Sequence, residues 1–63
     1  MKDPKDSDNW VIWGLILRTV GSYEPARHKF KKAVRINPSN EAAKFELDIV
    51  ERIIELDKVI PLD

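Results

Sequence analysis

Hydrophobic and polar residues recur along this chain with the period of α-helices, in three segments divided by turn residues. This pattern predicts one helix over residues 8–20 and a second over residues 24–36, separated by the turn sequence GSY. Residues 41–63 are predicted to form a third helix, which begins after NPSN and continues to about Val59, because Pro61 prevents its further extension. No segment alternates as a β-strand does. The sequence therefore predicts an all-α fold, in which a helix-turn-helix hairpin follows a flexible tail (residues 1–6) and precedes a longer third helix.

Small polar residues stand at the predicted starts of the first and third helices. Ser7 or Asp8 can accept a hydrogen bond from the free amides of the first helix, and Ser39 or Asn40 can do so for the third. Glu41 adds a negative charge beside the positive end of the third helix. These residues support the predicted boundaries.

The first helix contains a run, WVIWGLIL (residues 10–17), that has no polar side chain. A helix that is apolar on all sides must be buried on all sides, and two other short helices cannot cover it fully. The run is much shorter than the roughly 18 residues of a membrane span, so we expect no membrane span.

The second helix is amphipathic. Ala26, Phe30, Ala33 and Val34 fall on one side, where the two alanines suit a close approach of helices around one large ring. The opposite side is basic and carries Arg27, His28, Lys31, Lys32 and Arg35.

The third helix carries two apolar rows. One row consists of Ala43, Leu47, Val50 and Ile54, and the other of Phe45, Ile49, Ile53 and Leu56. Together the rows cover about 200° of the helix, where one packing face needs little more than about 100°. One row can pack on the first two helices, and the other is left over.

Spacing within residues 7–40 resembles that of a known repeat. The positions that carry the resemblance are Trp10, Trp13, Gly14, Leu17, Gly21, Tyr23, Ala26, Phe30, Ala33 and Pro38. They resemble the tetratricopeptide repeat, W-x2-L-G-x2-Y followed by A-x3-F and a closing proline, with Trp13 in place of the leucine and Leu17 in place of the tyrosine. The resemblance implies that these residues form the core motif of one repeat. It also implies that residues 41–63 form the extra helix that ends such an array.

The resemblance further implies a scaffolding function, in which the inner surface of the helices holds another protein. The residues that it places on this surface are Val11, Ile12, Leu15, Phe45, Ile49 and Ile53. They are mostly apolar, so the expected partner is an apolar helix or peptide, or a second copy of the chain. Two other interpretations remain open: these residues belong to the core, or they are exposed because the chain is the excised end of a longer array.

Charge suggests an alternative function. The chain has 11 basic and 11 acidic residues, yet residues 1–40 carry a net charge of +4 and residues 41–63 a net charge of −4. The basic side of the second helix could bind nucleic-acid phosphates or another anionic surface. The sequence disfavours this alternative, because no aromatic residue interleaves with the bases and because Asp48, Glu51 and Glu55 can neutralise them.

No residue pattern suggests catalysis. The chain has no cysteine and a single histidine, His28, and its three serines stand at cap or turn positions. We therefore expect no enzyme activity, no cofactor, no metal and no small-molecule substrate. The sequence assigns no compartment, and a soluble protein of cytoplasmic type is the favoured expectation.

Overall fold

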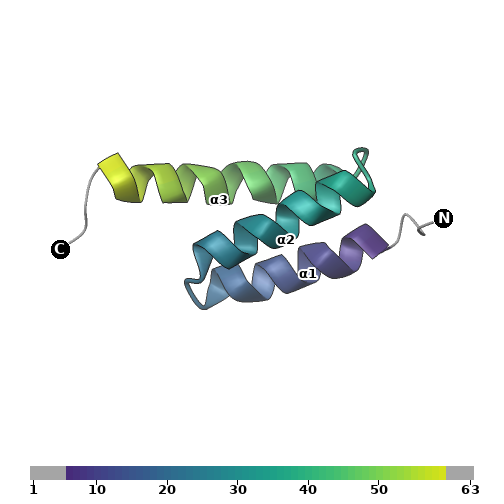
Figure 1. Ribbon diagram of the computed structural model, residues 1–63, viewed down its shortest axis with the longest axis horizontal. Helices are drawn as coiled ribbons and strands as arrows, with labels where there is room; N and C mark the ends of the chain where they lie inside the picture. Colours follow the sequence, from purple (N-terminus) through teal and green to yellow (C-terminus); the bar gives the residue numbers. More distant parts are fainter. Residues whose placement is uncertain (1–5, 60–63) are drawn as a thin grey trace.

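The computed structural model describes residues 6–59, which form three helices, α1 (Asp6–Thr19), α2 (Tyr23–Ile36) and α3 (Glu41–Val59). α1 and α2 form an antiparallel hairpin, and α3 returns along α2 in the direction of α1 (Figure 1). The C-terminal end of α3 extends beyond the turn that joins α1 to α2 (Figure 1). Residues 6–59 contain no strand, so the predicted all-α fold with a longer third helix is confirmed.

The helix boundaries lie within two residues of the predicted ones. α1 begins at Asp6 rather than at residue 8, so Ser7 lies in its first turn instead of preceding it. The Ser7 side chain is fully buried and its hydroxyl accepts a hydrogen bond of 2.8 Å from the Asn40 side-chain amide. Residues 1–5 of the predicted tail and residues 60–63 of the predicted terminal segment lie outside the described residues.

The turn between α1 and α2 depends on Gly21. Its φ of 83° lies in the left-handed region, which glycine adopts without the penalty of a Cβ atom. The Gly21 N–H donates to the Arg18 carbonyl at 3.0 Å, and the Ser22 N–H donates to the Leu17 carbonyl at 2.9 Å. This pair of bonds is a Schellman motif, which satisfies the last carbonyls of α1 and ends the helix.

Asn40 connects the start of α3 to the start of α1. Its Oδ1 accepts a hydrogen bond of 3.1 Å from the Ala43 N–H, so the prediction that Ser39 or Asn40 caps the third helix is confirmed for Asn40. Its Nδ2 donates to the Ser7 hydroxyl at 2.8 Å and to the Asp8 carboxylate at 2.9 Å. One side chain therefore caps α3 and ties it to α1.

The core lies where α2 contacts both other helices. Ala26, Phe30 and Ala33 are fully buried on α2, as the sequence pattern predicted. Gly14 of α1 faces Phe30 so closely that a Cβ atom at Gly14 would lie 2.5 Å from the Phe30 ring. The absence of a side chain at Gly14 thus allows α1 to approach α2.

α3 completes the core with its first apolar row. Ala43 and Val50 are fully buried, Ile54 is nearly so, and Leu47 packs against the cluster. The row of Phe45, Ile49, Ile53 and Leu56 is not needed for this packing, which leaves Phe45 and Leu56 exposed. This division of α3 into a packed row and a left-over row follows the sequence pattern.

Three of the predicted core-motif residues lie nearer to solvent than we expected. Trp13 is 52 % exposed, so its prediction as a core residue is wrong. Gly14 marks the side of α1 that faces α2, and Trp10, four positions earlier, packs partly against the core on that side. Trp13 points in a different direction around the helix, toward solvent. Tyr23, at the start of α2, and Pro38, in the turn before α3, are also exposed, whereas Leu17 packs against the core.

Candidate interaction surfaces

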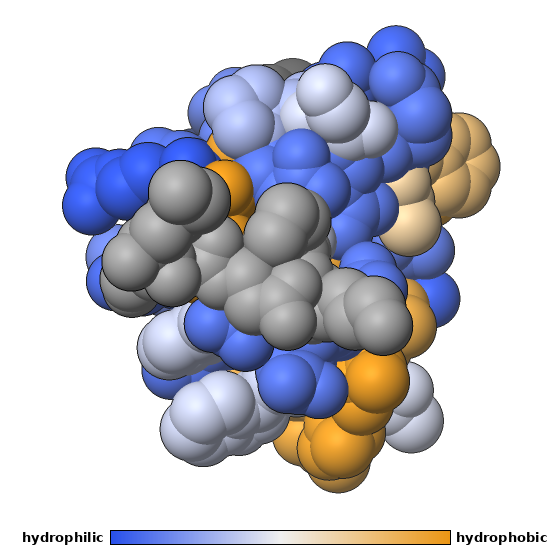
Figure 2. Space-filling view, turned by 90° about the vertical axis from the view of Figure 1, so that its right-hand side faces the viewer, coloured by the Kyte–Doolittle hydropathy of each residue, from blue (hydrophilic) through white to orange (hydrophobic). Residues whose placement is uncertain are grey.

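One side of α1 carries large apolar side chains that the rest of residues 6–59 leaves more than half exposed. We call it the α1 outer face, and it consists of Ile12, Trp13, Ile16 and Val20, with exposed fractions of 55 %, 52 %, 58 % and 69 %. Ile12, Ile16 and Val20, which directly follows the last residue of α1, are four positions apart, and Trp13 lies beside Ile12 and three positions before Ile16. They therefore form one continuous row along the helix. Viewed from the end where α1 begins, apolar side chains gather along the lower right edge of the molecule (Figure 2).

A second apolar surface lies on α3. We call it the α3 apolar row, and it consists of Phe45, Ile49, Ile53 and Leu56. Phe45 is 64 % exposed and Leu56 is 59 % exposed, whereas Ile49 and Ile53 are half-buried. The row continues over most of the helix, including the end that extends beyond the hairpin (Figure 1).

The six residues predicted to contact a partner differ in their exposure. Val11 is only 7 % exposed and belongs to the core, so it is unable to serve as a contact residue without unfolding. It is buried because it lies on the core side of α1, where α2 and α3 cover it. Ile12 and Phe45 are exposed, Ile49 and Ile53 are half-buried, and Leu15 is half-buried against the core.

Ile16, Val20 and Leu56 were not among the predicted contact residues. The spacing from Ile12 to Ile16 to Val20 follows one side of a helix, so the sequence contains this signal. The family pattern gave these three residues no role on the inner surface. The α1 outer face is therefore a result of the structure.

An ion pair joins α1 and α3 between the two apolar surfaces. Arg18 Nη1 approaches Glu46 Oε1 at 3.0 Å, with side chains that are 32 % and 18 % exposed. Glu46 Oε1 is buried, and the contact does not have the geometry of a hydrogen bond. We therefore regard it as a charge contact that orients the helices weakly.

Trp10 and Trp13 form a stacked pair with two lysines beside it. Their ring centroids are 5.7 Å apart and their planes differ by 21°. The Lys29 Nζ lies 4.2 Å from the Trp13 ring centroid and 5.2 Å from that of Trp10, and the Lys32 Nζ lies 5.6 Å from the Trp10 ring centroid. These cation–π contacts join the edge of α1 to the basic side of α2.

The basic side of α2 forms a shallow depression of about 210 Å³ that we call the basic cleft. It is lined by His28, Lys31, Lys32 and Arg35. Arg27, the fifth predicted basic residue, turns away and pairs with Glu24 at 2.7 Å.

Carboxylates of α3 do not neutralise the basic cleft as we expected from the sequence. Asp48 pairs with Arg52 at 3.2 Å and Glu55 with Lys58 at 4.0 Å, both within α3. No ion pair joins α2 to α3 among residues 6–59. The prediction of neutralisation between these two helices is therefore wrong.

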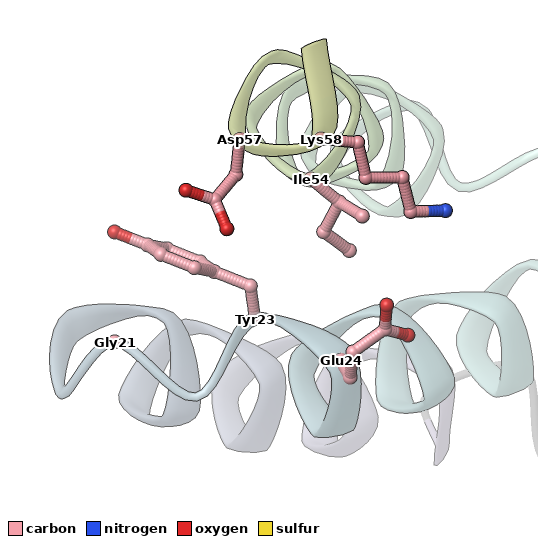
Figure 3. A pocket seen from close by; sticks show the side chains of 6 residues that line it. All are labelled: Gly21, Tyr23, Glu24, Ile54, Asp57 and Lys58. Atoms are coloured by element: carbon pink, nitrogen blue, oxygen red, sulfur yellow. The ribbon is translucent and has the colours of Figure 1, made fainter. Parts of the chain in front are cut away.

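Another depression, of about 250 Å³, separates the start of α2 from the C-terminal half of α3 (Figure 3). Tyr23 and Glu24 line it from below, and Ile54, Asp57 and Lys58 from above (Figure 3). Its side chains include no nucleophile paired with a base. In the described part of the chain, no group of three or more histidines, cysteines, aspartates and glutamates could hold a metal ion.

Comparisons with known proteins do not identify a family for this chain. No protein-family model, no curated protein and no solved structure matches this chain. Among the described residues, no helix combines the length and the apolar character that crossing a membrane requires.

Proposed function

We propose that this protein is an interaction module of tetratricopeptide-repeat type, which binds an apolar helix of another protein or a second copy of itself. The α1 outer face carries the proposal, because it presents four large apolar side chains in one row. Contiguous apolar patches of this kind usually mark interaction sites on soluble proteins. Trp13 adds a side-chain type that is enriched among the residues that dominate binding energy.

The spacing of the two surfaces suits a helical partner. A helix recognises a groove through apolar residues three, four and seven positions apart, and the α1 outer face and the α3 apolar row both follow that spacing. Because the two surfaces lie on different helices, a partner can cover either one alone or both together. A second copy of the chain offers the same surfaces in return, as a symmetric dimer requires.

The proposed relation to tetratricopeptide repeats is supported by how the hairpin packs. Gly14 and Ala26 are buried small residues beside Phe30, which matches the role of their motif positions in such a repeat. The direction of α3 along α1 also corresponds to that of successive repeats (Figure 1). This relation is a proposal about ancestry and packing, and the binding proposal depends only on the exposed surfaces.

Two substitutions test the binding proposal. Ile16→Lys places a charge in the α1 outer face, and Ile49→Lys does the same in the α3 apolar row. As a control, Glu51→Lys adds a lysine elsewhere on α3. Light scattering of the folded proteins should show that at least one of the two isoleucine variants loses self-association while the control keeps it. The proposal is wrong if both variants associate and bind partner proteins as the unmodified chain does.

A further inference from the structure

Ion pairs divide the basic side chains of the molecule into two groups. Within residues 6–59, five of the nine lysines and arginines pair with a carboxylate, and the other four do not. The unpaired ones are Lys29, Lys31, Lys32 and Arg35, and all of them lie on α2. Like charges one helical turn apart repel one another, so this arrangement costs stability unless an anion binds there.

Three of these four unpaired side chains line the basic cleft, where one anionic ligand could contact them together. His28, Lys31, Lys32 and Arg35 line one depression, and from the first to the last of them the helix rises by about 10 Å. This length exceeds that of one phosphate group and suits successive phosphates of a chain. Glu24, one turn before His28 on α2, is held by Arg27.

Aromatic rings lie at the border of the basic cleft. Lys32 lines the cleft and also lies 5.6 Å from the Trp10 ring, which is stacked on the half-exposed Trp13. The sequence alone does not predict this neighbourhood, because the tryptophans and the lysines belong to different helices. Cations that follow a backbone beside rings that accept bases are the combination found in proteins that bind single strands.

We propose that the basic cleft and Trp13 form a binding site for single-stranded nucleic acid. Phosphates contact Lys31, Lys32 and Arg35, and one base stacks on Trp13. The half-buried Lys29 now lies over the Trp13 ring, in a cation–π contact of a strength that the stacking of a base can match or exceed. The base can therefore displace this flexible side chain, which then contacts a neighbouring phosphate.

A flat anionic membrane fits this arrangement less well. The basic cleft lies on the side of α2 opposite Ala26 and Ala33, which are buried in the core. Of the α1 outer face, it is Trp13 that contacts the basic side of α2, through Lys29. The aliphatic side chains that a membrane would take up, Ile12, Ile16 and Val20, do not line the basic cleft. A flexible strand needs only the cleft and the adjoining ring.

The test measures the binding of a fluorescent 12-nucleotide single strand by anisotropy at low and rising salt. The double variant Lys31→Glu/Arg35→Glu is compared with Lys44→Glu/Lys58→Glu, which makes the same charge change at α3 lysines that already pair with carboxylates. We expect at least a tenfold loss of affinity for the cleft variant and less than a twofold loss for the control. The logarithm of the binding constant should fall linearly with the logarithm of the salt concentration, with a slope of about −0.7 for each phosphate contact.

Trp13→Leu separates nucleic acid from other phosphate chains. It should weaken binding of the oligonucleotide severalfold but leave binding of inorganic polyphosphate unchanged. Several results would overturn the proposal: no binding at low salt, equal losses in the cleft variant and its control, or an unchanged affinity of Trp13→Leu for the oligonucleotide. Tighter binding to vesicles that contain phosphatidylserine than to the oligonucleotide would overturn it as well. Because Trp13 also belongs to the α1 outer face, light scattering of Trp13→Leu and of Ile16→Lys accompanies the test. Normal oligonucleotide binding by a monomeric Ile16→Lys variant would show that the nucleic-acid site does not depend on self-association.

Discussion

The apolar run of α1 supplies both a close core contact and an exposed surface, and the two differ in what surrounds them. Gly14 faces Phe30 with no room for a Cβ atom, whereas Ile12 and Ile16, two positions away on either side, are more than half exposed. In both places the run contains no polar side chain. An apolar pattern thus identifies residues that favour burial. Which of them are buried within this chain depends on how many helices pack around them.

The two phenylalanines of the chain test this difference most strongly. Phe30→Ala removes a fully buried ring and should lower the free energy of unfolding by about 3–5 kcal/mol. Phe45→Ala makes the same chemical change at a ring that is 64 % exposed and should cost less than about 0.5 kcal/mol.

Urea unfolding followed by circular dichroism measures both variants. A chain of 63 residues has a total stability of about 3–9 kcal/mol, so Phe30→Ala should remove at least about a third of it and lower the urea midpoint far more than Phe45→Ala does. Equal losses for the two variants would mean that Phe45 is covered in solution or that Phe30 is not central to the core.

Gly14→Ala tests the close contact itself. The added Cβ atom would lie 2.5 Å from the Phe30 ring, and such overpacking costs about 1–3 kcal/mol. Alanine favours a helix over glycine by about 1 kcal/mol, so the net loss should be smaller than for Phe30→Ala.

Gly21→Ala is the control for this substitution. Nothing lies within 4 Å of a Cβ atom there, and the cost comes only from the left-handed backbone, about 1–2 kcal/mol. Each glycine substitution is also combined with Phe30→Leu, and thermal unfolding measures the stability of the two double variants. The smaller leucine should relieve Gly14→Ala but not Gly21→Ala, and relief of both would contradict the contact described here.

Asn40→Ala removes the cap of α3 together with its hydrogen bonds to α1. We expect a loss of about 1–2 kcal/mol, because the Ala43 N–H loses its acceptor and the buried Ser7 hydroxyl loses a donor. Asn37→Ala removes only a local bond to the Ser39 N–H and should cost about half as much. Chemical unfolding measures both, and a larger effect for Asn37→Ala would contradict the role given to Asn40.

Glu46→Gln should have the smallest effect. It removes the charge contact with Arg18, which is partly exposed and should contribute at most about 1 kcal/mol. Raising the salt concentration should reduce the difference in the free energy of unfolding between Glu46→Gln and the unmodified chain. A loss well above this value would mean that the contact fixes the angle between α1 and α3.

The three helices could be predicted from the sequence because the helical spacing of apolar residues stops at each boundary where turn or cap residues occur. GSY contains the glycine that ends α1, and Asn40 provides the cap that begins α3. The buried row of α2 also followed directly, since Ala26, Phe30 and Ala33 form one side of an amphipathic helix.

The candidate surfaces were harder to predict because they depend on how the helices cross. The motif position of Trp13 predicts a core residue, yet Trp13 lies at the edge of the α1–α2 contact, against Lys29. The same motif predicts that Val11 lies on the inner surface, yet Val11 is buried. Neither placement can be read from one helix alone, and the nearness of the lysines to the tryptophans arises only from their packing.

The proposal that the exposed faces of α1 and α3 bind protein is tested most directly by sedimentation equilibrium over a wide concentration series. We predict that the folded chain, monitored by its helical circular dichroism, increases in mass with concentration, and that Ile16→Lys or Ile49→Lys returns it to the mass of a monomer. A chain that stays folded and monomeric at every concentration would contradict self-association through these faces.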